Sequence, residues 1–252
     1  MDIPEIIALG LSACGLKQGD TTLVHCSLRS LGIENAAESL LEGLLRILGE
    51  DGTILVPSLS YMTINAEQNF FDINSTPSCA GGFTEYFRKC PGVERSLHPT
   101  HSVCGLGKHA CAVLSKHQLD NSPCGPNSPY AALRDCGGKI IFIGCGIRPN
   151  TSMHGVEETL SPYPPYLFSE SVRYILKGAD GKISGMDCLR HGFKKFGYVQ
   201  RYDRIEPLLS SSEMFKGKLM DAEIVVMDAR AVWEKGHAAL LRDKLFFVEK
   251  IN

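Results

Sequence analysis

The sequence predicts an α/β fold with a mixed sheet, because short apolar runs alternate with amphipathic helical stretches. At 252 residues the chain is long enough for one large domain, and neither a repeat nor a Gly/Ser-rich linker divides it. We therefore expect residues 1–252 to form a single domain. The net charge of −2 and the scattered Lys and Arg residues argue against a nucleic-acid partner.

The strands and helices follow one another along the chain. Residues 1–15 predict a short amphipathic helix that begins with an acid, unlike a signal peptide. Buried strands are predicted for the apolar runs at 21–28, 52–60, 138–146 and 222–229. Helices are predicted for 36–50, 81–90 and 229–243, and in the first of these the leucines at 40, 41, 44, 45 and 48 fall on one face.

Two further features favour a mixed sheet. Residues 171–184, "SVRYILKGADGKIS", carry a central "GADG" turn and predict an antiparallel hairpin. The final "KLFFVEKI" is typical of a short edge strand. No apolar stretch approaches the ~20 residues of a membrane span, so we expect a cytoplasmic protein without a membrane partner.

Long irregular segments separate these elements at 61–80, 91–103, 117–130 and 147–168. They are rich in Asn, Pro, Ser and Thr. A compact domain carries such loops mainly where they build a site. We therefore expect the functional residues to come from the first two-thirds of the chain.

The segment "GCGIRPNTSMHGVEE", residues 144–158, follows a predicted strand and begins a helix near Asn150. His154 then lies in the first turn, at the edge where open α/β sheets bind ligands. Glu157 and Glu158 are three and four residues further on, so either carboxylate can orient the imidazole as a base. The alternative is an exposed histidine at a helix start, and spacing alone leaves both open.

The segment "VHCSLRSLG", residues 24–32, joins a strand to a helix. Ser27, Ser30 and the backbone N–H groups between them can cradle a phosphate, but an ordinary capped turn fits equally. His25 and Cys26 point to opposite faces of a regular strand, so they cannot form a pair. A buried thiol is the simpler interpretation of Cys26.

The segment "ERSLHPTHS", residues 94–102, gathers polar side chains in a loop. Arg95, Ser96, His98 and His101 suit a phosphate-bearing ligand, whereas the HxxH spacing alone is a weak metal signal. The alternative is a loop whose histidines bond to backbone carbonyls.

The remaining candidates are several cysteines, one nearby histidine and Asp203, which has an arginine on each side. Cys188 and His191 supply half of a zinc site. The chain has ten cysteines and no CxxC pair, so reduced thiols are expected. Cys124 is a candidate nucleophile without an adjacent basic partner. Asp203 lies between Arg201 and Arg204, where either an ion pair or contact with a cationic substrate is consistent with the pattern.

Taken in order, these segments resemble the aminoglycoside 3-N-acetyltransferase family, the antibiotic N-acetyltransferases outside the GNAT superfamily. The matching stretches are "LVHCSLRSLG", "GTILVPSLS", "RSLHPTHSVCGLGKHA", "SPCGPNSPYAAL", "GKIIFIGCG", "NTSMHGVEE" and "KGKLMDAEIVVMDARAVWE". They cover nearly the whole chain.

The resemblance implies a three-layer α/β/α fold and acetyl transfer from acetyl-CoA to an amine of an aminoglycoside or related amino sugar. His154 matches the family's catalytic histidine and Glu157 the acid that follows it. The implied CoA-binding residues are Ser27, Leu28, Arg29, Ser30, Arg95, Ser96, His98 and Ser102. The implied partners are the small-molecule amine and CoA, no metal is implied, and the sequence leaves a homodimer open.

The sequence also departs from the family. Cys26 stands where a serine is usual, and the chain has little room for insertions that shape an antibiotic pocket. A polycationic acceptor would favour a strongly acidic cleft, so a different amine, such as an amino sugar, also fits. Two other mechanisms stay open: an acyl-enzyme on Cys26 or Cys124, and a metallohydrolase using His98, His101, Cys188 and His191. A third alternative is a protein that binds CoA but has no transferase activity.

Overall fold

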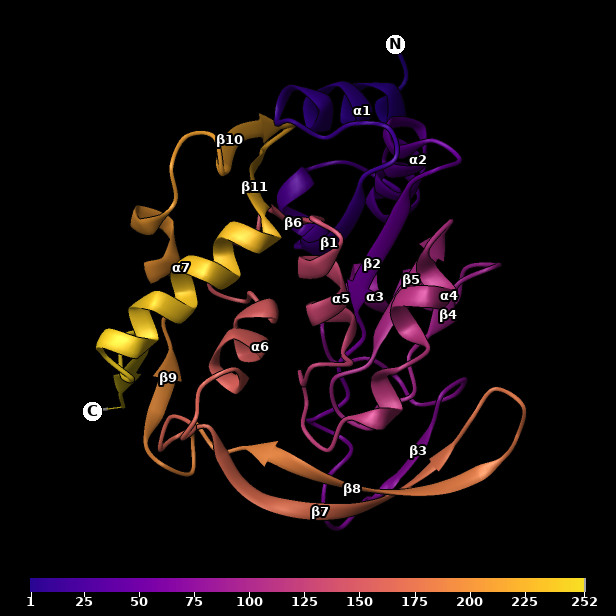
Figure 1. Ribbon diagram of the computed structural model, residues 1–252. Coiled ribbons are helices and arrows are strands. Elements are labelled where there is room, and N and C mark those ends of the chain that lie inside the picture. Colours follow the sequence, from indigo (N-terminus) through magenta and orange to yellow (C-terminus); the bar gives the residue numbers. More distant parts are fainter. Residues whose placement is uncertain (252) are drawn as a thin grey trace.

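The centre of the fold is a seven-stranded mixed sheet (Figure 1). A computed structural model describes residues 1–251. The strands follow the order β10-β11-β6-β1-β2-β5-β4 across the sheet. Their bounds are Thr21–Cys26 (β1), Thr53–Pro57 (β2), Glu94–Arg95 (β4), Val103–Gly107 (β5), Lys139–Ile143 (β6), Met214–Leu219 (β10) and Ala222–Asp228 (β11).

The three central strands, β6, β1 and β2, are parallel to one another. Each strand outside them is antiparallel to its neighbour in the sheet. In register, Leu23 of β1 lies beside Leu55 of β2 and Ile140 of β6. All three side chains are buried. These runs are apolar on both faces because helices cover both sides of a parallel sheet.

One face of the sheet is covered by α1 (Ile3–Ala13), α2 (Ala36–Leu48) and α3 (Gly82–Phe87). In α2, Leu40, Leu44 and Leu48 pack against the sheet, whereas Leu45 is 43% exposed. The predicted face of five leucines is therefore too broad. Positions four residues apart stay on the buried side, and Leu45 has rotated out of it.

The opposite face is covered by α4 (Ala110–Leu114), α5 (Pro129–Asp135), α6 (Ser152–Glu158) and α7 (Ala229–Arg242). Trp233 of α7 packs on α6 so closely that a Cβ on Gly155 would lie 2.4 Å from its ring. The indole N–H donates to the Ser152 hydroxyl at 2.8 Å. These layers confirm the expected three-layer α/β/α fold with a mixed sheet.

A separate three-stranded sheet lies at one end of the molecule (Figure 1). It has the order β3-β7-β8, from Phe70–Asp72 (β3), Phe168–Lys177 (β7) and Ile183–His191 (β8). The antiparallel pairing of β7 with β8 confirms the predicted hairpin. We call these three strands the satellite sheet.

The last strand lies away from the central sheet. β12 (Val248–Lys250) pairs only with β9 (Tyr198–Gln200), so the predicted edge strand forms a small ribbon of its own. Short 3-10 helices complete the fold at Leu28–Leu31 (η1), His117–Leu119 (η2) and Tyr202–Leu208 (η3). No helix within residues 1–251 is long and apolar enough to cross a membrane.

Candidate active site

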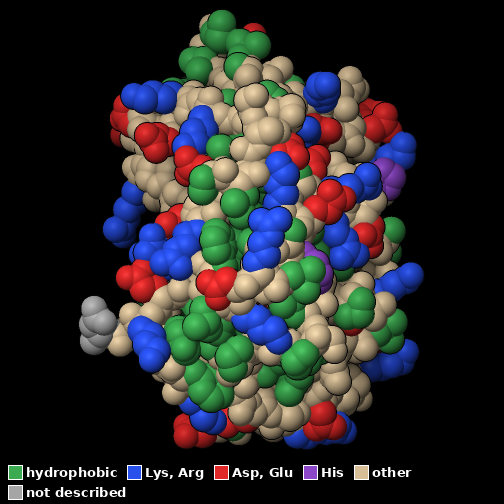
Figure 2. Space-filling view, turned by 60° about the vertical axis from the view of Figure 1, so that its left-hand side comes forward, with side chains coloured by type: hydrophobic (Ala, Val, Ile, Leu, Met, Phe, Trp, Pro, Cys, Tyr) green, Lys and Arg blue, Asp and Glu red, His purple; other side chains and the backbone are tan. Residues whose placement is uncertain are grey.

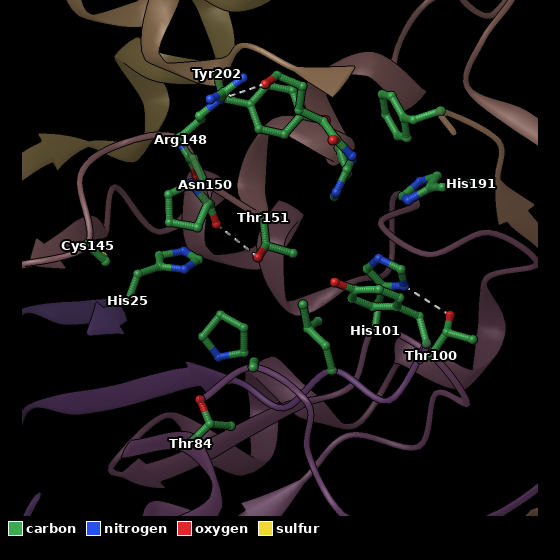
Figure 3. Close-up of a pocket in the computed structure, with 18 of the residues that line it drawn as sticks. His25, Thr84, Thr100, His101, Cys145, Arg148, Asn150, Thr151, His191 and Tyr202 are labelled. Atoms are coloured by element: carbon green, nitrogen blue, oxygen red, sulfur yellow. Dashed lines mark hydrogen bonds between the residues drawn. The ribbon is translucent and has the colours of Figure 1, made fainter. Parts of the chain in front are cut away.

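A cavity of about 1000 Å³ lies at the carboxyl ends of β1, β2 and β6 (Figure 3). The ends of these strands and the segment between β6 and α6 form one wall, which we call the central wall. The end of β8 and the residues directly after it form the other, the satellite wall. Ligands of open α/β sheets bind at this edge, and the volume is that of a small-molecule site.

His154 reaches the central wall of the cavity from the first turn of α6. Its Nδ1 lies 2.7 Å from the Tyr202 hydroxyl and 3.3 Å from Glu157 Oε2. The Tyr202 hydroxyl in turn donates to Glu157 Oε2 at 2.7 Å. With Nδ1 held in this way, Nε2 is the nitrogen that is free to exchange a proton with a ligand.

Glu157 is fully buried behind His154, with none of its side chain exposed. It accepts hydrogen bonds from Tyr202 and, at 2.9 Å, from the Tyr166 hydroxyl. Burial first, and the adjacent Glu157 charge second, raise the pKa of Tyr202 well above its usual value. Both phenols are therefore neutral donors near neutral pH, and they hold the carboxylate against the imidazole.

Asn150 ends the turn that precedes α6 and lines the same wall. Its Oδ1 accepts from the Ser152 N–H at 3.2 Å, which fixes the amide plane. Its Nδ2 is buried and has no hydrogen-bond partner within residues 1–251. A buried donor without a partner costs stability, so this amide is a candidate contact for a bound ligand.

Three histidines meet where the two walls of the cavity come together. One ring nitrogen each of His101, His154 and His191 lies within 4.8 Å of the others, a spacing that could hold a metal ion. The rings of His154 and His191 are 4.2 Å apart between centroids. Burial first, and neighbouring positive groups second, lower the pKa of His101 and His191 well below the usual value. These two imidazoles are therefore neutral at neutral pH.

Glu158 is the counterpart of Glu157 on the other side of α6. It lies 3.2 Å from His191 Nε2, and it accepts from the Ser122 hydroxyl and the Cys124 N–H. Burial raises the pKa of Glu158 to about 8. The two adjacent glutamates thus serve different histidines, a division that spacing could not decide.

The turn at residues 27–30 begins beside the cavity, but none of its four residues lines it. Ser30 Oγ donates to the Gly144 carbonyl at 2.9 Å and lies 3.0 Å from Ser27 Oγ, so the two hydroxyls tie η1 to the end of β6. Leu28 packs against the core beneath α2. Arg29 is exposed. The phosphate contact of these residues stays a prediction.

The predicted cluster in residues 95–102 is an internal brace. Arg95 donates to Ser102 Oγ at 2.9 Å and to the Ser58 carbonyl at 2.9 Å. Ser96 Oγ lies 2.9 Å from His117 Nδ1. Ser96 and Ser102 are at most 1% exposed, and Arg95, Ser96 and Ser102 do not line the cavity. Their side chains are thus engaged by protein, and their contact with a cofactor stays a prediction.

His98 and Cys188 also lie beneath the cavity and bond to each other. His98 Nε2 is 3.4 Å from Cys188 Sγ, and its Nδ1 accepts from the His101 N–H at 3.0 Å. Both ring nitrogens are thus occupied by protein. The four residues suggested as a metal site separate accordingly: His98 pairs with Cys188, while His101 and His191 join His154.

Asp203 forms an ion pair with Arg201 at 2.9 Å and does not line the cavity. The ion-pair alternative for this acid is therefore the one that the geometry favours. All ten cysteines are free. Cys26 lines the cavity, and burial raises the pKa of its thiol to about 12. Cys124 is 1% exposed, and burial raises its pKa well above the usual value.

Sequence reasoning missed Tyr166, Tyr202 and Arg190. The two tyrosines lie 9 and 45 residues from Glu157 in the chain, so no local spacing reveals their contacts with it. The long polar segment 147–168 does contain Tyr166, and the mixed segment 188–209 contains Tyr202. Only their position in segments without regular periodicity could have indicated that they belong to the site.

Comparison with known proteins shows which family the chain resembles. A family model described as aminoglycoside 3-N-acetyltransferase matches residues 23–240. The SPbeta prophage-derived aminoglycoside N(3')-acetyltransferase-like protein YokD of Bacillus subtilis (strain 168) is 31% identical over 180 residues, which cover 63% of this chain and 65% of that protein. This chain thus spans just under two thirds of that relative.

Two further relatives cover more of the chain. Aminoglycoside N(3)-acetyltransferase IV of Salmonella sp is 28% identical over 239 residues, covering 93% of this chain and 85% of that protein. A crystal structure of a mutant of aminoglycoside acetyltransferase AAC(3)-IVa in complex with apramycin has a TM-score of 0.79 at 26% identity. It covers 98% of this chain and 94% of that one.

Proposed function

The chain belongs to the aminoglycoside 3-N-acetyltransferase family, and from this premise we propose that it is an acetyl-CoA-dependent N-acetyltransferase. The acceptor is a primary amine of an aminoglycoside or a related amino sugar. The acetyl group passes directly from the thioester to the amine, with His154 as general base. The observation that carries this proposal is the hydrogen-bonded set in which His154 and Tyr202, which both line the cavity, meet the buried Glu157 behind them.

A base is needed because most alkyl amines are protonated near neutral pH, and an ammonium group cannot attack a carbonyl. An imidazole has an ordinary pKa near ~6.5, which suits proton removal at neutral pH. His154 Nε2 accepts the proton from the amine. Glu157 and Tyr202, on Nδ1, fix the tautomer and stabilise the imidazolium that results. The C–N bond forms, the C–S bond breaks, and CoA leaves as the thiol after taking up a proton.

Asn150 supports the same reaction by acting on the oxygen of the thioester carbonyl group. Negative charge develops on the thioester oxygen as the amine attacks. A rigid donor aimed at that oxygen lowers the barrier. The unpartnered Nδ2 of Asn150 is such a donor, and its plane is already fixed by the Ser152 N–H. We assign it to the carbonyl oxygen.

An acyl-enzyme on cysteine is the less favourable route. The nucleophile would be a thiolate, and a thiol whose pKa is about 12 is protonated near neutral pH. Cys26 has no basic side chain bonded to its sulfur among the described residues. Cys26→Ser separates the two routes: direct transfer predicts activity within about threefold, whereas a nucleophile would lose orders of magnitude.

The central experiment is a thiol-release assay with acetyl-CoA and a panel of aminoglycosides and amino sugars. His154→Ala should lower kcat roughly 10²–10⁴-fold, while acetyl-CoA binding, measured by calorimetry, stays within about threefold. His109→Ala is the matched control, since that histidine is exposed at the start of α4. Undiminished turnover in His154→Ala would overturn the assignment of the base.

A metal-dependent hydrolase is a second candidate, because the spacing of His101, His154 and His191 favours it. His191 Nε2 also lies 3.2 Å from the Glu158 carboxyl group, and carboxyl partners are common among metal-binding histidines. Metal analysis of the purified protein separates the two functions. Stoichiometric zinc, with activity that a chelator removes, would favour the hydrolase over the transferase.

A further inference from the structure

The charged residues that line the cavity are all positive. They are Arg148, Arg190, Lys194 and Lys195, and no Asp or Glu lines it within residues 1–251. The outer surface differs, since Figure 2 shows Lys and Arg interspersed with Asp and Glu. The whole chain carries 26 Lys and Arg against 28 Asp and Glu. The positive lining is therefore a local property of the cavity.

The two carboxylates near the cavity are turned away from it. Glu157 has no exposed side-chain surface and accepts from the hydroxyls of Tyr166 and Tyr202. Glu158 has 4% of its side chain exposed and accepts from the Ser122 hydroxyl at 2.5 Å. Both are committed to protein donors and to histidines, so neither can receive a cationic ligand.

The positive side chains are mostly not neutralised by protein. Within the described residues, no ion pair joins Arg148, Arg190 or Lys194 to a carboxylate. Lys195 lies 3.6 Å from Glu170, but both side chains are more than half exposed. An exposed pair of this kind is weak and leaves most of the charge to solvent or ligand. The cavity therefore presents uncompensated positive charge.

Arg190 places part of this charge beside the attack point. It directly precedes His191 and donates to the carbonyls of Ile64 and Tyr61 and to the Tyr174 hydroxyl. The pKa values of His101 and His191 are lowered first by burial and second by the neighbouring histidines. The charge of Arg190 lowers both pKa values further. Arg190 and His191 both line the cavity, on the satellite wall.

The phosphates of CoA do not account for charge at this place. They lie at the far end of the pantetheine arm from the thiol, so they are distant from His154 when the thioester reaches it. Arg148 lies across the cavity from His191, where its Nε donates to the Gln200 carbonyl at 3.1 Å (Figure 3). Positive side chains therefore line both walls of the cavity.

Resting on the transferase function above, we propose that the acetyl acceptor is an amine that carries an anionic group, either a phosphomonoester or a carboxylate. Arg190, Lys194 and Lys195 of the satellite wall bind that anion while the amine faces His154. An anionic acceptor gains charge-assisted hydrogen bonds from these donors. An aminoglycoside with several ammonium groups meets like charges and finds no carboxylate.

The test compares glucosamine, glucosamine 6-phosphate and 2-amino-2-deoxyglucuronic acid at saturating acetyl-CoA. They share the amine and the ring and differ at one substituent. We expect kcat/KM to be at least 10-fold higher for one or both anionic sugars, and the better of the two identifies the anion. Equal values for all three, or a preference for kanamycin over both anionic sugars, would overturn the proposal.

A double variant locates the anion. Lys194→Gln with Lys195→Gln should reduce the preference for the anionic sugar to within about threefold, with the KM for acetyl-CoA unchanged. Lys182→Gln is the matched control, because that lysine is 87% exposed at the hairpin turn between β7 and β8. An unchanged preference with a raised KM for acetyl-CoA would assign the lysines to CoA instead.

The outcomes separate this proposal from the proposed function. Thiol release with glucosamine but without any preference contradicts the anionic acceptor alone. Absence of release with every amine contradicts the transferase. In that case thermal stabilisation by the sugars in the presence of CoA decides: stabilisation by the anionic sugar that the double variant abolishes supports the anion site, and its absence overturns it.

Discussion

The two walls of the cavity differ in origin and in what they contribute. The central wall is built from parallel strands whose ends are fixed by a packed core on both faces, and it carries His154 and Asn150, with the buried Glu157 behind them. The satellite wall comes from a hairpin that pairs only with β3. It carries Arg190 and His191.

The difference separates chemistry from selection. Groups that move protons or hold developing charge need positions fixed to a fraction of an ångström, which a close-packed core supplies. Groups that select the acceptor need the right charge and shape. Charge and shape can be supplied by residues whose positions are held less precisely. We therefore expect substitutions in the central wall to lower kcat, and substitutions in the satellite wall to change the KM for the amine.

After His154→Ala, the largest effect is expected for Asn150→Ala. Loss of an oxyanion donor should lower kcat roughly 10²–10³-fold, with acetyl-CoA affinity within about threefold. Steady-state kinetics and calorimetry measure the two quantities, and circular dichroism checks the fold. A kcat within threefold of the parent protein would remove Asn150 from the reaction.

Glu157→Gln is expected to lower kcat by about 10²-fold, because the imidazolium loses its buried counter-charge. Tyr202→Phe should have a smaller effect in the same direction. Because the two residues share one oxygen, their effects should not add in the double variant. Additive losses in kcat would show that the tyrosine and the glutamate act separately.

His191→Asn tests the satellite wall. The KM for the amine should rise about 10-fold while kcat falls less than threefold, since the ring faces the acceptor but does not hold the proton. The expected pattern is the reverse of that for Glu157→Gln. A loss confined to kcat would place His191 in the chemistry and erase the distinction between the walls.

His25 offers a pH test of the central wall. Burial lowers the pKa of His25 to about 3, whereas the unfolded chain has the ordinary value of 6.5. Below pH 6.5 the unfolded state binds the additional proton, so this contribution to stability is lost as the pH falls. Relative to His25→Phe, the free energy of unfolding should drop by about 1.4 kcal/mol per pH unit between 6.5 and 4.5. A difference that is constant across that window in urea titrations would contradict the prediction.

The sequence allowed the layers, the hairpin and the position of His154 to be predicted, because each depends on local periodicity or on a strand that ends in a polar turn. The C-terminal strand was predicted but its partner β9 was not, because pairing partners are not encoded locally. The brace formed by Arg95, Ser96 and Ser102 looked like a ligand site, since polar side chains in a loop carry the same pattern whether they face water or protein.

The partners of Glu157 and Glu158 could not be assigned for a related reason. Three-residue and four-residue spacings both fit a helix face, and only the packing of η3 and β8 decides which histidine each carboxylate meets. Contacts between segments far apart in the chain, such as that between Tyr202 and Glu157, leave no signal in a single sequence.

The hairpin's limited attachment has an evolutionary consequence. Because β7 and β8 pair with β3 and not with the seven-stranded sheet, mutations along them leave the registers around His154 intact. Lineages can therefore exchange the residues that contact the acceptor without rebuilding the residues that acetylate it. We therefore expect the residues of β7 and β8 to vary more among relatives than those that hold His154.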